Sequence, residues 1–85
     1  MVKINKEWIE FKFFRPQAKE VFLVGDFCNW QVGSLKMAQN EDGYWLGYAH
    51  LPRGTYKFRY FSDGSWYTDF AAYGVVGDDS LICVE

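Results

Sequence analysis

The acidic side chains are the first candidates for chemistry in this 85-residue sequence. Asp63 and Asp69 form the most suggestive carboxylate pair, and paired carboxylates can hydrolyse glycosidic bonds. Asp63, however, precedes Gly64, and Asp-Gly is the pair that two-residue hairpin loops favour. A catalytic acid also needs a desolvated cleft that raises its pKa, and a thin domain offers little room for one. We therefore interpret Asp63 as a turn residue and predict that the chain is not an enzyme.

The remaining reactive side chains are few and lie far apart. His50 is the only histidine, and it falls at a solvent-facing position of an alternating segment. Cys28 and Cys83 have no metal-ligand spacing. Their even number leaves a disulfide open, although we favour free thiols, and a redox role for Cys28 stays undecided. No phosphate loop or dinucleotide fingerprint occurs. We predict neither a metal nor a cofactor.

The charge balance argues against nucleic acid and membrane as partners. Nine basic residues face eleven acidic ones, which gives a net charge of −2. The segment 56–61 does interleave Lys57 and Arg59 with aromatic residues, as single-strand binders do, but no wider basic stripe accompanies it. No apolar run is long enough to span a bilayer, and the N-terminus lacks the apolar stretch of a signal peptide. With two cysteines, these features predict a cytoplasmic protein.

Aromatic residues make up 21% of the chain and include four tryptophans. Trp30 follows Asn29 in a polar loop, and Trp66 comes just after an Asp-Gly turn. Loops run over the surface, so core packing explains these two rings poorly. Sugar rings have apolar C–H faces that lie flat on indole, and their hydroxyl rims accept charged or planar donors. The two loop tryptophans therefore favour sugar binding. Trp8 and Trp45, which alternate with apolar residues, are predicted to lie in the core.

The elements that would position these side chains are strands. Alternation of period two predicts strands, and no segment has a helical period. Turn signals separate the segments, notably at 52–54 and 63–64. The sequence therefore predicts an all-β, immunoglobulin-like antiparallel β-sandwich of six to seven short strands, as a single domain over residues 1–85. The predicted strands are 8–14, 21–24, 34–39, 44–51, 56–61, 66–68 and 80–84, with loops over 25–33 and 69–79.

Three segments carry a resemblance to a known family. Residues 25–30 (GDFCNW), 51–56 (LPRGTY) and 59–66 (RYFSDGSW), followed by Asp69, resemble the family-48 carbohydrate-binding modules. That family includes the glycogen-binding domain of the AMP-activated protein kinase beta subunit. It also includes N-terminal early-set domains of isoamylases, pullulanases and branching enzymes. The resemblance runs from about Trp8 to Val84. It implies an immunoglobulin-like sandwich that binds α-1,4-linked glucan, such as glycogen, starch or maltooligosaccharide, without catalysis.

The resemblance also implies a set of site residues. Trp30 and Trp66 stand where the family has its two stacking tryptophans. Arg59 fills the place of the basic residue that hydrogen-bonds sugar hydroxyls. Asp79 stands where the family has a sugar-contacting asparagine, and a carboxylate accepts hydrogen bonds but cannot donate them.

Further departures from the family pattern fall in the two long loops. Cys28 replaces an asparagine of the first loop. In the second loop, Val75 or Val76 is the candidate for the apolar residue that clamps the sugar.

A second interpretation keeps the fold without the sugar. Exposed aromatic residues also anchor protein interfaces. A sugar site predicts Trp30 and Trp66 exposed on one face with Arg59 between them. An interaction module predicts a broader apolar patch that involves Tyr44, Tyr48 or Tyr73. The expected partners are accordingly an α-glucan or a protein of glycogen metabolism.

Overall fold

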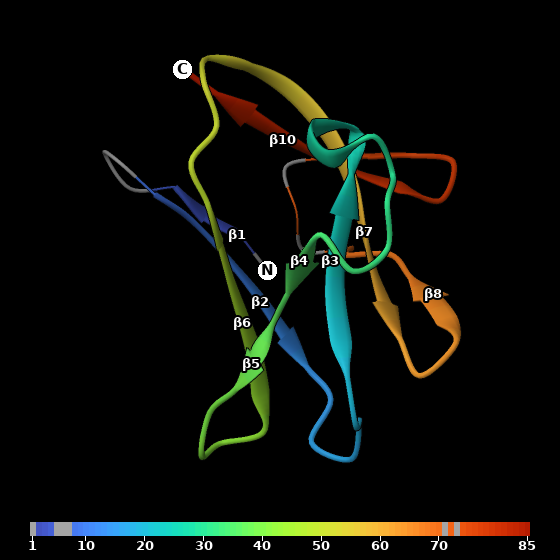
Figure 1. Ribbon diagram of the computed structural model, residues 1–85. Coiled ribbons are helices and arrows are strands. Elements are labelled where there is room, and N and C mark those ends of the chain that lie inside the picture. Colours follow the sequence, from blue (N-terminus) through green and yellow to red (C-terminus); the bar gives the residue numbers. More distant parts are fainter. Residues whose placement is uncertain (1, 5–7, 71, 73) are drawn as a thin grey trace.

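Two antiparallel sheets make up the fold (Figure 1). The computed structural model describes residues 2–4, 8–70, 72 and 74–85. The four-stranded sheet has the order β1-β2-β6-β5. Its strands are β1 (Val2–Ile4), β2 (Ile9–Phe14), β5 (Ala38–Gln39) and β6 (Tyr44–Ala49). The predicted all-β sandwich is confirmed.

The six-stranded sheet has the order β4-β3-β7-β10-β9, and β8 also pairs with β7. Its strands are β3 (Val21–Gly25), β4 (Leu35–Lys36), β7 (Gly54–Ser62), β8 (Ser65–Tyr67), β9 (Gly74–Val76) and β10 (Asp79–Val84). A single 3-10 turn, η1 (Asp26–Cys28), follows β3. Among the described residues the strands thus number ten, more than the six or seven predicted.

The differences from the predicted strands have local causes. The predicted strand 34–39 is two short strands, one in each sheet, because Met37 turns inward between them. Met37 is only 2% exposed, and its N–H donates to the carbonyl of Val21 at 2.9 Å. The strands β1 and β9 were not predicted, since each has three residues and shows too little alternation for a pattern. The turn η1 is equally short.

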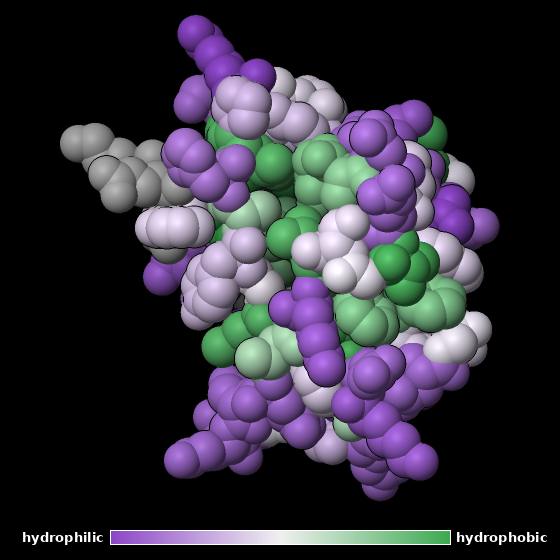
Figure 2. All heavy atoms as spheres, in the orientation of Figure 1, coloured by the Kyte–Doolittle hydropathy of each residue, from purple (hydrophilic) through white to green (hydrophobic). Residues whose placement is uncertain are grey.

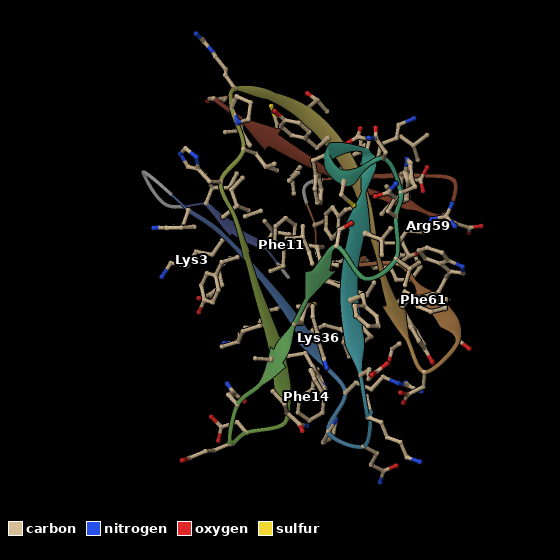
Figure 3. The ribbon with its side chains drawn as sticks, in the orientation of Figure 1. Lys3, Phe11, Phe14, Lys36, Arg59 and Phe61 are labelled. Carbon is tan, nitrogen blue, oxygen red and sulfur yellow. The ribbon has the colours of Figure 1, made fainter. Side chains whose placement is uncertain are left out.

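Apolar side chains from both sheets meet between the layers. In Figure 2, hydrophilic residues gather at the two ends of the sandwich, and apolar residues are visible between them. Figure 3 shows Phe11 of β2 in this interior, and its ring meets the edge of Phe58 from β7 at 5.0 Å. The buried cluster consists of Ile9, Phe11, Val21, Leu23, Met37, Trp45, Ala49, Phe58, Tyr60 and Ile82.

Two tryptophans were predicted to lie in this core, and one of the predictions is wrong. Trp45 is 6% exposed, and its Nε1 donates to the carbonyl of Arg15 at 2.8 Å. Trp8 is 53% exposed. Period-two alternation explains the difference, because the adjacent Ile9 faces the core and Trp8 must then face outward. The prediction for Trp8 rested on its being a large apolar ring at the end of a strand, and that feature alone does not place a side chain in the core.

The strand β7 runs through the middle of the six-stranded sheet. It pairs with β3 along one edge, from Phe58 to Ser62. Along the other edge it pairs first with β10, up to Phe58, and then with β8, from Tyr60 onward. The partner therefore changes at Arg59. Because side chains alternate, Phe58 and Tyr60 are buried while Arg59 faces outward.

The two carboxylates considered for catalysis are engaged separately. Asp63 occupies the β7–β8 turn with φ 48°, and its carboxylate accepts from the backbone N–H groups of Lys19 and Glu20 at 3.2 Å. Asp69 is 6% exposed, and its Oδ2 accepts from the Tyr60 hydroxyl at 2.8 Å. Its backbone N–H donates to Ser80 Oγ at 2.7 Å. Both aspartates therefore have structural roles, one in a turn and one in the core.

Replacing Tyr60 by phenylalanine tests the buried hydrogen bond. We expect Tyr60→Phe to lower the free energy of unfolding by about 1–3 kcal/mol, because it removes a donor from a buried carboxylate. Tyr56→Phe is the matched control, since that hydroxyl donates to the carbonyl of Pro52 at 2.6 Å in an exposed position. Water can replace it there, so the expected loss is about 0.5 kcal/mol. Urea unfolding measures both, and equal losses would contradict the assignment.

The pH dependence provides a second readout for Tyr60. Burial raises the pKa of its hydroxyl above the ordinary value of 10.0. The unfolded chain therefore loses this proton at a lower pH than the folded chain does. The contribution of Tyr60 to stability is fully present below pH 10 and declines as the pH rises further. We expect the decline to be smaller in Tyr60→Phe than in the wild type.

Candidate functional site

The four residues singled out from the sequence lie together at one pocket of about 480 Å³. It is called the Trp30–Trp66 pocket here, and its lining residues are Trp30, Lys57, Arg59, Trp66 and Asp79. They come from the loop after η1, from β7, from β8 and from the start of β10. Figure 3 shows Arg59 and Phe61 on the outer side of the six-stranded sheet, away from Phe11. Segments far apart in the sequence thus meet on one face.

Trp30 is held by an unusual backbone conformation. Asn29 and Trp30 have φ of 57° and 58°, which is the left-handed region. The N–H of Trp30 donates to the carbonyl of Gly25 at 2.9 Å and closes the turn. Asp26 links this loop to β7, because its Oδ2 accepts from the N–H of Lys57 at 3.2 Å. The ring of Trp30 is 37% exposed as a result.

The thiol of Cys28 fastens the same loop from inside. Its sulfur accepts from the N–H of Gly25 at 3.4 Å and donates to the carbonyl of that residue at 3.3 Å. An asparagine amide can also both accept and donate, which explains how cysteine can stand at this position. Both Cys28 and Cys83 are free thiols.

Trp66 is positioned by the hairpin that joins β7 and β8. Asp63 and Gly64 have positive φ values of 48° and 85°, as a tight two-residue turn requires. This turn places Trp66 opposite Phe61, and the two rings make an edge contact with centroids 4.7 Å apart. One side of the indole rests on Phe61, and the residue stays 45% exposed.

Arg59 lies between the two tryptophans. Its guanidinium carbon is 5.8 Å from the ring centroid of Trp30 and 6.0 Å from that of Trp66. Its Nε donates to Oδ1 of Asp79 at 2.6 Å. This contact uses only one nitrogen of the fork, so the terminal nitrogens are left to donate to a ligand. Two apolar rings with a charged donor between them match the arrangement that sugar binding requires.

Sequence reasoning missed Lys57 as a member of the site. Its spacing from Arg59 could have indicated this, because the two residues are two positions apart on one strand and their side chains point to the same face of the sheet. Val75 and Val76, the candidate clamp residues, lie exposed on β9. Neither belongs to the residues that line the pocket. Val76 pairs with Asp79, the residue of β10 that lines the pocket.

Two of the three tyrosines that would mark a protein interface lie away from this pocket. Tyr44 and Tyr48 belong to β6 of the other sheet, and Tyr73 lies outside the described residues. Within residues 2–4, 8–70, 72 and 74–85, no group of three or more His, Cys, Asp and Glu side chains is arranged to hold a metal ion. In the same part of the chain no helix is long and apolar enough to cross a membrane.

Comparison with known proteins gives a family and several relatives. The model of the carbohydrate-binding module 48 family (isoamylase N-terminal domain) matches residues 2–74. A 1,4-alpha-glucan branching enzyme GlgB 1 from Clostridium perfringens is 30% identical over 79 residues, which are 87% of this chain and 12% of the enzyme. The 5'-AMP-activated protein kinase subunit beta-1 of Rattus norvegicus is 37% identical over 51 residues, 60% of this chain and 18% of that subunit. The chain thus spans a small part of the length of these relatives.

Replacing Gly25 by alanine tests how tightly the Trp30 loop is packed on β7. A Cβ at Gly25 would lie 2.5 Å from the ring of Phe27 and 2.6 Å from the carbonyl oxygen of Lys57. The backbone must move to accommodate it, so we expect Gly25→Ala to lower the free energy of unfolding by about 1–3 kcal/mol. Gly74→Ala is the control, because its nearest neighbour is Leu81 Cδ1 at 3.4 Å. Urea unfolding compares them, and equal stabilities would show that the loop is loosely packed.

Proposed function

The chain belongs to the carbohydrate-binding module 48 family, and on this basis we propose that it binds α-1,4-linked glucan at the Trp30–Trp66 pocket. The domain is a carbohydrate-binding module, which is a non-catalytic type of domain, although it also occurs in branching enzymes. The relatives whose names contain 1,4-alpha-glucan support this choice of sugar. We extend the proposal to the protein as a whole, which then acts by binding and not by catalysis.

The observation that carries the proposal is the position of Arg59 between two exposed indoles. Each indole offers a flat apolar surface for the C–H face of a glucose unit, which adds about 1 kcal/mol beyond the burial of area. The guanidinium between them donates charge-assisted hydrogen bonds to the hydroxyl groups of the same units. Two stacked rings and a few hydrogen bonds, set against the cost of association, correspond to micromolar to millimolar affinity.

Asp79 acts on Arg59 and only through it on the sugar. A sugar-contacting asparagine would donate as well as accept, whereas Asp79 already accepts from Arg59 Nε at 2.6 Å. The contact holds the guanidinium through Nε and does not use the terminal nitrogens. The ion pair is also partly exposed to solvent, with side-chain exposures of 29% and 22%, so we assign it a geometric role more than an energetic one.

A weak module of this kind gains by holding another activity near a polymer. Tethering raises the effective concentration of a linked or bound partner at the glucan. We therefore propose that the partners are an α-glucan, such as glycogen or starch, and a protein of glycogen metabolism, with the cytoplasm as the compartment.

The pocket is tested by titration with maltoheptaose or β-cyclodextrin, followed by intrinsic tryptophan fluorescence. We expect a saturable change in the wild type and a loss of affinity of at least about tenfold in Trp66→Ala, because one stacking surface and its buried area disappear. Trp8→Ala is the matched control, since Trp8 is exposed to a similar degree (53% against 45%) but lies next to β2 of the other sheet. Its affinity should equal that of the wild type.

Two results of this titration would contradict binding at the Trp30–Trp66 pocket. No saturable change at millimolar sugar, in a protein whose circular dichroism shows it to be folded, would refute the proposal for these glucans. Equal losses in Trp66→Ala and Trp8→Ala would place the binding site elsewhere.

Two substitutions test the positioning role of Asp79. Asp79→Ala leaves the Arg59 side chain without its anchor, and we expect the dissociation constant for maltoheptaose to rise about tenfold. Asp79→Asn keeps an oxygen that accepts from Arg59 Nε, so affinity should stay within about threefold of the wild type. Isothermal titration calorimetry measures both. An alanine variant that binds as tightly as the wild type would contradict the positioning role.

A further inference from the structure

The outer face of the four-stranded sheet carries a row of exposed aromatic residues at each of its ends. Its outward residues on β2 and β6 are paired as Glu10 with Tyr48, Lys12 with Leu46 and Phe14 with Tyr44. Trp8 and His50 continue the same face at one end, with their rings 6.1 Å apart. This β2–β6 face therefore consists of Trp8, Glu10, Lys12, Phe14, Tyr44, Leu46, Tyr48 and His50, and Lys3 of β1 borders it beside Glu10.

Large apolar groups on this face have no cover among the described residues. Trp8, Phe14 and Tyr48 are 53%, 57% and 52% exposed. Trp8 and Tyr48 also line an open hollow of about 370 Å³. Exposed aromatic rings gathered around a hollow are typical of a contact surface. Figure 3 shows Lys3 of β1 pointing outward on this side, opposite to Arg59 and Phe61.

The charges in the middle of the face are ordered by sign along the strand. Glu10 and Lys12 point the same way and lie one pleat apart on β2. Glu10 Oε2 accepts from the Tyr48 hydroxyl at 3.3 Å, and Lys12 Nζ lies 4.7 Å from the ring centroid of Tyr44. Along β2 the side chains of the face are thus, from one end to the other, aromatic, negative, positive and aromatic, and the positive charge of Lys3 lies beside Glu10 on β1.

We propose that this face binds a second copy of the chain, face to face, across a two-fold axis that runs perpendicular to the strands. Such an axis keeps β2 opposite β2 and reverses its direction. Glu10 of each copy then meets Lys12 of the other, and Trp8 meets Phe14. On β6, Tyr48 meets Leu46. The contact is self-complementary in the charges of β2, and it places an aromatic ring of one copy at the hollow of the other.

The alternative face-to-face axis, parallel to the strands, does not pair these charges. It would place Glu10 opposite Tyr48 and Lys12 opposite Leu46, so neither charge would meet an opposite charge across the contact. Charge complementarity therefore selects the perpendicular axis. Sheets that pack in this manner keep their strand directions within about 30° of each other, which suits two identically twisted sheets.

The dimer leaves the other sheet of each copy free. The Trp30–Trp66 pockets then lie on opposite outer sides of the assembly, so that one dimer can hold two glucan chains or two parts of one polymer. This consequence rests on the proposed function, whereas the dimer itself does not. A weak single site combined with a second, linked site gains affinity for a polymer and none for a short oligosaccharide.

Analytical ultracentrifugation of two charge-reversal variants tests the proposal. On β2, Glu10→Lys has two lysines on the contact, next to Lys3 of β1, and Lys12→Glu has two glutamates. Each variant alone brings like charges together, and we expect its dimer dissociation constant to rise at least about tenfold over the wild type. An equimolar mixture of the two restores both opposite-charge contacts, so it should form dimers as well as the wild type does. Lys36→Glu, on β4 of the other sheet, is the control and should dimerise normally.

The mixture distinguishes an intermolecular contact from a folding defect, because a misfolded variant cannot be rescued by another. A wild type that stays monomeric into the millimolar range would overturn the proposal. A dimer that neither charge reversal weakens would overturn it too, because the contact would then lie on another face. Both variants should still bind maltoheptaose as the wild type does, so that failure of the dimer and failure of the glucan site give different results.

Discussion

The alternation of side chains along β7 is the constraint on which both the core and the site depend. Phe58 and Tyr60 point into the sandwich, so Lys57, Arg59 and Phe61 must point away from it. A shift of one residue in the register would bury Arg59 and expose Tyr60, which the hydrogen bond from Tyr60 to the buried Asp69 also opposes. The packing that stabilises the domain therefore also fixes the outward direction of Lys57 and Arg59, the two residues of β7 that line the Trp30–Trp66 pocket.

The change of partner along β7 explains why the pocket lies where it does. The strand is paired with β10 up to Phe58 and with β8 from Tyr60, so Arg59 lies at the junction of two neighbours. Asp79 begins β10 at that junction and reaches Arg59 Nε at 2.6 Å. The divergence of β8 from β10 leaves the side chain room on this edge, and Trp66 of β8 borders it. A sheet with one continuous partner strand would offer a flatter surface.

Much of the fold could be predicted from the sequence because period two is strong where strands are long. The structure has the alternation predicted for segments 44–51 and 56–61, and it has the turn predicted at Asp63 and Gly64. Short elements such as β1 and β9 carry too little pattern, and the division of 34–39 at Met37 depends on a contact with Val21 that no local rule contains. The grouping of Trp30, Arg59 and Trp66 could be predicted from loop placement and family resemblance. The membership of Lys57 in the pocket and the ion pair between Asp79 and Arg59 could be found only from the structure.

The left-handed backbone at Trp30 is best understood as a means of pre-organising the pocket. A bulky residue in this region costs of order 1 kcal/mol relative to glycine, and two successive residues, Asn29 and Trp30, adopt it. The hydrogen bond to Gly25, the thiol of Cys28 and the link from Asp26 to Lys57 hold the turn against that cost. The tight Asp63-Gly64 turn does the same for Trp66. Both indoles are thereby fixed before a ligand arrives, and little conformational entropy remains to be lost on binding, which matters most for a small site with two aromatic rings and two cations.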